Sequence, residues 1–137
     1  GEPFRVAVEE PDPQARRARF VVGLEDRAIA TSGSYRNVQV VDGVLHSHLI
    51  DPVTGRPVRH RLLAASVLHA RCADADAWAT ALMVAGPDSA WALARAAGLD
   101  AALLVGTPGG EVEERLTDGF RAALVTMPSP STRRVLP

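Results

Sequence analysis

The chain has 137 residues, of which 47% are apolar and 23% are charged, so it fits one folded domain and excludes large-scale disorder. Fifteen basic residues are offset by sixteen acidic ones, and this balance argues against nucleic acid as a partner. No apolar run approaches the roughly 20 residues that are needed to span a bilayer.

The first half of the chain is predicted to consist of strands. Apolar or alternating runs bounded by turn residues predict strands over residues 4–9, 19–24, 27–31, 35–41, 44–50 and 62–70. Glu25-Asp26 and Asp42-Gly43 each lie between two of these runs, so each predicts a hairpin. Residues 51–57 (DPVTGRP) are rich in turn residues and predict a loop.

The hydrophobic period becomes helical after residue 74. A helix is predicted over 75–85, with Asp74 as its N-cap. One predicted face carries Trp78, Ala81, Leu82 and Ala85, and another carries Asp76, Thr80 and Met83. Residues 86–88 break this helix, and a second helix is predicted over 89–97, closed by Gly98 at the C′ position.

The last third returns to strands. Strands are predicted over 101–105, 111–116 and 120–125, with a turn at 106–110 and a Pro-rich tail at 127–137. The pattern predicts an α+β fold, in which a helix pair packs on one face of a largely antiparallel sheet, and a single domain over 1–126. Cys72 is interpreted as a small buried packing residue just before the helix, with a reactive thiol as the alternative.

Asp76 and Thr80 place a carboxylate and a hydroxyl one turn apart on the predicted helix. Both are hard oxygen ligands suited to Mg²⁺, which usually takes one or two protein carboxylates together with water and substrate phosphates. The alternative is structural: Asp76 complements the helix dipole and Thr80 bonds back to a carbonyl. By spacing alone the structural interpretation is the commoner one.

His46 and His48 lie two residues apart on a predicted strand, so both side chains are expected on one face. The spacing is compatible with zinc or with catalysis, although surface histidines are commoner and no further ligand pair lies nearby. His48 leads directly into the turn-rich loop, where a substrate could approach. As a general base it could accept the proton of an incoming hydroxyl, with a structural role as the alternative.

Residues 31–35 (TSGSY) offer hydroxyls and backbone amides beside Gly33. They could hold a phosphate or a flavin edge, although an ordinary β-turn is the commoner interpretation. Gly33 lacks the context of a GxGxxG or P-loop fingerprint.

Five strings in the chain resemble, in order and spacing, the second half of the ApbE family of FAD:protein FMN transferases. They are AIATSGSYRN, DG, HSHLIDPVTGRPV, ADAWATALMVAG and DGF. The string HLIDPVTG and the helix with its Asp and Thr are the specific ones. The opening GEPFRVAVEEP also resembles the family segment that follows a mid-protein glycine pair.

The resemblance implies a magnesium-dependent enzyme that moves FMN from FAD, through a phosphoester, onto a Thr or Ser of a target flavoprotein and releases AMP. It implies that Asp76 and Thr80 are metal ligands. It also implies that His48 is the base that deprotonates the acceptor hydroxyl.

The same resemblance implies a nucleotide-binding set from two segments. Ser32 and Tyr35 are expected to line the flavin nucleotide site. Ile50, Asp51 and Thr54 are expected, with His48, in the loop around the phosphates and the incoming acceptor.

The family's first half is not part of this sequence, so an N-terminal half of the same protein is an expected partner beside FAD and the acceptor flavoprotein. Two alternatives remain: a magnesium-dependent FAD pyrophosphatase that yields FMN and AMP, and a non-catalytic module that binds flavin nucleotides. The resemblance implies the bacterial cell envelope or periplasmic side, with the cytoplasm as the alternative compartment.

Overall fold

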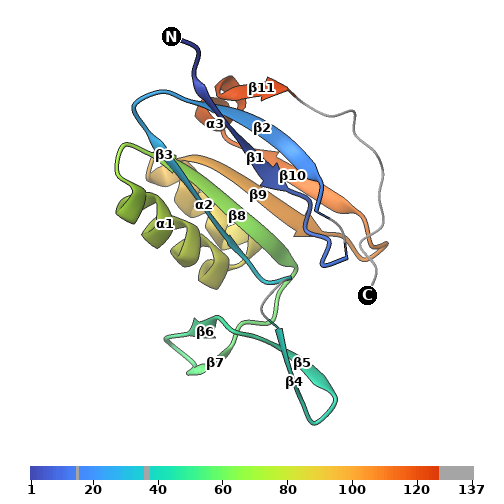
Figure 1. The fold of residues 1–137 in the computed structure, drawn as a ribbon. Coiled ribbons are helices and arrows are strands. Elements are labelled where there is room, and N and C mark those ends of the chain that lie inside the picture. Colours follow the sequence, from blue (N-terminus) through green and yellow to red (C-terminus); the bar gives the residue numbers. More distant parts are fainter. Residues whose placement is uncertain (15, 36–37, 127–137) are drawn as a thin grey trace.

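A computed structural model of the chain describes residues 1–14, 16–35 and 38–126 (Figure 1). The predicted tail at 127–137 lies outside the described residues. The described elements are, in chain order, β1 (Phe4–Glu9), β2 (Ala18–Leu24), β3 (Ala28–Gly33), β4 (Val38–Val41), β5 (Val44–Ser47), β6 (Ile50–Asp51), β7 (Arg56–Pro57), β8 (Leu62–His69), α1 (Cys72–Ala85), α2 (Pro87–Ala96), β9 (Asp100–Gly106), β10 (Val112–Leu116), α3 (Asp118–Ala122) and β11 (Leu124–Thr126).

The larger strands form two antiparallel sheets. A four-stranded sheet has the order β10-β9-β8-β3, and a three-stranded sheet has the order β1-β2-β11. Helices α1 and α2 cover one face of the four-stranded sheet, and the three-stranded sheet lies across the other (Figure 1). The predicted α+β class with a helix pair on one face is confirmed, and the strands divide among two larger sheets and two small hairpins where one sheet was expected.

Strand β9 shows why the four-stranded sheet is buried on both faces. Successive side chains of a strand point to opposite faces, and along β9 they enter two different clusters. Ala101, Leu103 and Val105 pack toward the helices, whereas Ala102 and Leu104 pack toward the other sheet. A continuous apolar run is therefore required here, because neither face meets water.

The predicted hairpin between 19–24 and 27–31 is wrong. Asp26 makes a turn, with φ of 50°, but β2 then pairs with β1 and β11, while β3 pairs with β8. The turn carries the chain from one sheet to the other. The second predicted hairpin is confirmed, because β4 pairs with β5 around Asp42-Gly43, where both residues have positive φ.

Helix α1 begins earlier than predicted. Its N-cap is Arg71, which makes no side-chain capping bond, so Asp74 lies inside the first turn and is not the cap. There its carboxylate lies 3.6 Å from His69 Nδ1 and 3.7 Å from Arg71 Nε, and it complements the helix dipole. Cys72 is exposed, so the interpretation as a buried packing residue is also wrong.

The buried residues of α1 include members of both predicted faces. They are Ala75, Ala79, Leu82 and Met83, with Trp78 partly buried beside them. Met83 is fully buried and so does not share an exposed face with Asp76. Ala81 and Ala85 are exposed. Small side chains at positions 75 and 79 let the helix lie close to β3 and β8.

Helix α2 starts at Pro87, in the first-turn position that proline tolerates, and not at residue 89 as predicted. Its predicted end at Gly98 is confirmed: Gly98 has φ of +64°, and Leu99 N donates to Ala94 O at 2.9 Å.

The predicted strand over 120–125 is wrong in its first half, because Phe120 lies in α3. Its ring packs edge-on against Phe20, with centroids 6.2 Å apart.

Two small hairpins, β4–β5 and β6–β7, project from one end of the layered body (Figure 1). We call residues 38–60 the arm. Within the described part of the chain, no helix has the length and apolar character needed to cross a membrane.

Candidate functional site

The clearest polar contact between the sheet and α1 joins two predicted site residues. Ser32 lies on the helix-facing side of β3, and its Oγ is 3.1 Å from Thr80 Oγ1 on α1. The neighbouring Thr31 points to the other face, where its hydroxyl lies 2.7 Å from Ser66 Oγ. The strand alternation therefore selects Ser32, and not Thr31, to meet α1.

Asp76 lies one turn before Thr80 on the same helix. Its side chain is exposed, and among the described residues its carboxylate makes no ion pair. The carboxylate of Asp74, two residues earlier, faces His69 and Arg71 instead. One carboxylate and one hydroxyl are hard oxygen donors that fit Mg²⁺, an ion that usually retains several waters. No group of three or more His, Cys, Asp or Glu side chains in the described ranges is gathered as a metal cluster.

The loop that carries His48 is fixed to the body by the residue that follows it. Leu49 packs against the cluster between the helices and the sheet, and its carbonyl accepts a hydrogen bond from Val58 N at 3.0 Å. Strand β5 ends at Ser47, so His48 lies in a bend and is exposed, while His46 is half-buried within the strand. The prediction that both histidines lie on one strand is therefore wrong.

Asp51 and Thr54 are used within the turn that joins β6 to β7. Asp51 Oδ1 accepts from Val53 N and its carbonyl accepts from Gly55 N, both at 2.8 Å. Thr54 Oγ1 accepts from Arg56 N at 3.3 Å. These contacts form an Asx-type turn and fix the loop conformation. Ile50, also expected in the nucleotide-binding set, is 50% exposed at the start of this hairpin.

Tyr35 is not brought together with Ser32. Its ring packs against the cluster between the two sheets, whereas Ser32 contacts α1 on the opposite face of the four-stranded sheet. The ring also lies against Gly33, where a Cβ would meet Tyr35 Cε1 at 2.7 Å. Glycine is therefore needed at position 33 to make room for the tyrosine.

The sequence analysis missed His60, which anchors the end of the arm. His60 Nε2 lies 2.7 Å from Met83 O, and its Nδ1 accepts from Leu62 N at 3.2 Å. These two bonds require the tautomer with the proton on Nε2. His60 thereby supplies a donor to a carbonyl near the C-terminal end of α1. Nothing in its spacing signals this role, because the contact joins residues 23 positions apart.

The arm carries an open hollow of about 710 Å³ with a basic lining. It is lined by His46, Thr54, Arg56, Pro57 and Arg59. The two arginines lie three positions apart in the sequence, and this spacing was the only sequence signal for the hollow.

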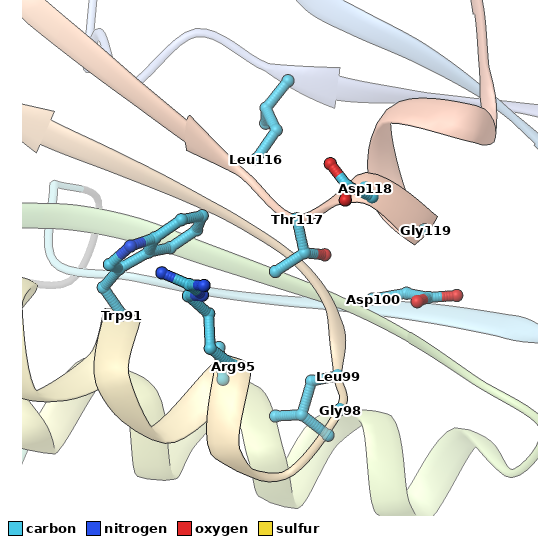
Figure 2. A pocket seen from close by; sticks show the side chains of 10 residues that line it. Trp91, Arg95, Gly98, Leu99, Asp100, Leu116, Thr117, Asp118 and Gly119 are labelled. Carbon is cyan, nitrogen blue, oxygen red and sulfur yellow. The ribbon is translucent and has the colours of Figure 1, made fainter.

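A second hollow, of about 390 Å³, lies between the C-terminal part of α2 and the segment where β10 leads into α3 (Figure 2). Trp91 and Arg95 extend from α2, Thr117 is the N-cap of α3, and Asp118 is the first residue of α3. Thr117 Oγ1 accepts from Ala101 N at 2.8 Å, so its oxygen already serves the backbone. None of the predicted site residues lines this hollow.

Comparison with known proteins gives a consistent result. A family profile described as the ApbE family matches residues 1–103. The chain is 39% identical over 126 residues to the FAD:protein FMN transferase of Escherichia coli K12, covering 92% of this chain and 36% of that protein. It is 43% identical over 124 residues to the protein of the same name from Vibrio cholerae, covering 90% of this chain and 37% of that one.

Solved structures agree with the sequence relatives. The flavin transferase ApbE from Vibrio cholerae superposes with a TM-score of 0.75 at 39% identity, over 89% of this chain and 38% of that chain. The apo form of the Pseudomonas stutzeri flavinyl transferase ApbE gives a TM-score of 0.73 at 35% identity, over 90% and 38% respectively. The chain thus spans little more than a third of these relatives, and on the profile match, the identities and the superpositions it belongs to the ApbE family.

Proposed function

We propose that this chain carries part of the catalytic site of an FAD:protein FMN transferase, with FAD as donor and a Thr or Ser of a flavoprotein as acceptor. The relatives that bear this name support the reaction class. Because the chain spans little more than a third of their length, we propose that activity also requires the segments those relatives have in addition.

The contact between Ser32 and Thr80 is the observation that carries the proposal. It holds the Thr80 hydroxyl at the edge of α1, one turn from the exposed carboxylate of Asp76. Thr80 retains lone pairs for a ligand if its proton is donated to Ser32. A helix surface that presents one carboxylate and one hydroxyl oxygen supplies few ligands. It therefore suits a magnesium ion that keeps several waters better than a magnesium ion enclosed entirely by protein ligands.

His48 is the proposed base. Its imidazole is exposed at the root of the arm, and Leu49 fixes the loop against the body. In the proposed step the acceptor oxygen forms a bond to the FMN phosphorus, its proton passes to His48, and the bond between that phosphorus and the AMP oxygen breaks. Magnesium bound at Asp76 and Thr80 would neutralise the charge that spreads over the phosphoryl oxygens.

The proposal is tested by assembling the chain within a full-length protein of this family. The protein is mixed with FAD, Mg²⁺ and an acceptor flavoprotein, and covalent flavin fluorescence on the acceptor is measured together with AMP release. Equal amounts of labelled acceptor and AMP are expected, and chelation of Mg²⁺ should stop both.

The other outcomes contradict the proposal in different ways. AMP and free FMN without labelled acceptor would identify an FAD pyrophosphatase. Saturable FAD binding with neither product would identify a flavin-nucleotide binding module.

A further inference from the structure

Four of the five described residues that line the basic hollow of the arm have no role in the transfer reaction proposed above; the fifth, Thr54, is expected by resemblance in the loop around the phosphates. The hollow lies between the hairpins β4–β5 and β6–β7, and its volume of about 710 Å³ lies within the range of small-molecule sites. A phosphate group fills only a small part of such a volume, so there is room for an organic group attached to it.

The lining offers donors to an anion. Arg56 and Arg59 each carry a planar guanidinium that can bind two oxygens of a phosphate. Among the described residues neither guanidinium is engaged in an ion pair, in contrast to Arg19, which lies 2.9 Å from Glu10. The described residues that line the hollow include no carboxylate to neutralise the two arginines.

Thr54 and His46 add to the donors. Thr54 Oγ1 already accepts from Arg56 N, so its hydroxyl proton is the part that is left for a ligand. His46 is half-buried in β5 and lines the same hollow. A lining made mainly of donors suits a phosphate, which presents several acceptor oxygens.

The loop is also preorganised. The turn that carries Thr54 and Arg56 is closed by the bonds from Val53 N and Gly55 N to Asp51. Gly55 has φ of +66°, a conformation that glycine adopts without strain. Binding an anion therefore does not have to order the turn first.

We propose that this hollow is a binding site for the phosphate or pyrophosphate group of a small molecule, held by Arg56 and Arg59 with Thr54 and His46. The inference does not depend on the transfer reaction, and it needs no metal. The phosphate belongs either to the nucleotide released in that reaction or to a separate phosphorylated ligand, and the probes below separate these sources.

The test uses the 137-residue chain, labelled with ¹⁵N, at low ionic strength and with a chelator present. Pyrophosphate, AMP and adenosine are titrated separately, and amide shifts are followed. Pyrophosphate and AMP should produce saturable shifts over residues 46–59, while adenosine produces none. AMP binding more tightly than pyrophosphate would assign the site to the nucleotide, and the reverse order would assign it to a separate ligand.

Variants localise the binding. Arg56→Gln and Arg59→Gln should each weaken pyrophosphate binding about tenfold, and the double variant should abolish it. Arg121→Gln removes an exposed arginine from α3 and is the matched control, with unchanged affinity. Thermal unfolding of all four variants checks that the fold is retained, which is expected because both arm arginines are exposed.

Three results would overturn the site. These are equal affinities in the Arg56→Gln and Arg121→Gln variants, saturable shifts on α1 instead of the arm, and binding of a glutamate-rich peptide without binding of pyrophosphate. Asp76→Asn separates the two proposals, because it should leave pyrophosphate binding to the 137-residue chain intact while it stops FMN transfer by the full-length protein.

Discussion

Ser32 Oγ and Thr80 Oγ1 lie 3.1 Å apart and join β3 to α1 across 48 positions of sequence. The contact places the hydroxyl of a proposed metal ligand at a fixed position relative to the sheet. Because the hydroxyl has a partner on another element, substitutions at the two positions can separate its role as a metal ligand from its contribution to stability.

Thr80→Val replaces the hydroxyl by a methyl group of similar size. We expect loss of magnesium-dependent FMN transfer, with a decrease of about 1 kcal/mol in the free energy of unfolding. Ser32→Ala removes the same hydrogen bond but leaves the Thr80 oxygen in place, so it should reduce stability similarly and reduce transfer less than Thr80→Val does. Urea unfolding and the fluorescence assay check both variants, and equal loss of activity in the two would make the hydrogen bond, not the metal, the cause.

Asp76→Asn should abolish magnesium-dependent transfer with little change in stability, because the side chain is exposed and forms no ion pair among the described residues. Asp74→Asn is the matched control on the same helix, since its carboxylate faces His69 and Arg71 instead. Transfer is measured over a range of Mg²⁺ concentrations. Full activity of the Asp76→Asn variant at all concentrations would remove Asp76 from the site.

His60→Ala should loosen the root of the arm. The change removes the donor to Met83 O and the acceptor of Leu62 N–H, so the free energy of unfolding should fall by about 1–2 kcal/mol. Amide exchange at Leu62 should become faster. His46→Ala, a change at another histidine of the arm, should leave exchange at Leu62 unchanged, and a slow Leu62 amide in the His60→Ala variant would contradict the anchoring role.

Gly119→Ala tests the close approach between α3 and β9. An added Cβ would overlap the carboxylate of Asp100, which also pairs with Arg27 at 3.2 Å (Figure 2 shows Gly119 and Asp100). We expect a loss of about 1–3 kcal/mol in the free energy of unfolding.

Two further variants control the prediction at Gly119. Gly109→Ala should cost much less, because the nearest atom to its added Cβ lies 3.9 Å away. In an Asp100→Ala background the cost of Gly119→Ala should shrink, because the overlapping group is gone. Equal costs in both backgrounds would place the strain elsewhere.

Sequence patterns correctly predicted the elements that depend on the conformational preferences of a few neighbouring residues. The hairpin at Asp42-Gly43 and the end of α2 at Gly98 were correct because each depends on a positive φ at a residue that adopts it readily. The strand over 4–9 was also correct. The spacing of Asp76 and Thr80 on one helix followed directly from the helical period.

The errors arose where the structure of a segment depends on its packing against residues far away in the sequence. Two apolar runs around Asp26 have the pattern of a hairpin. In the structure they do not pair with each other, because β2 pairs with β1 and β3 pairs with β8. Phe120 was placed in a strand because its neighbours are apolar, whereas its ring packs against Phe20 from a short helix. Burial of Met83 depends on which side of α1 meets the sheet, and periodicity alone does not fix this rotation.

The sequence by itself determined the family resemblance, the α+β class and the position of Asp76 and Thr80 one turn apart on a helix. These follow from the order of residues and from the helix and strand periods. Only the tertiary structure decided that Ser32 meets Thr80, that Tyr35 packs on the other side of the sheet, that His60 anchors the arm and that Arg56 and Arg59 line one hollow. The physical reason is that these relationships join segments far apart in the chain. They are fixed by the packing of two sheets and a helix layer around two apolar clusters, which no local pattern specifies.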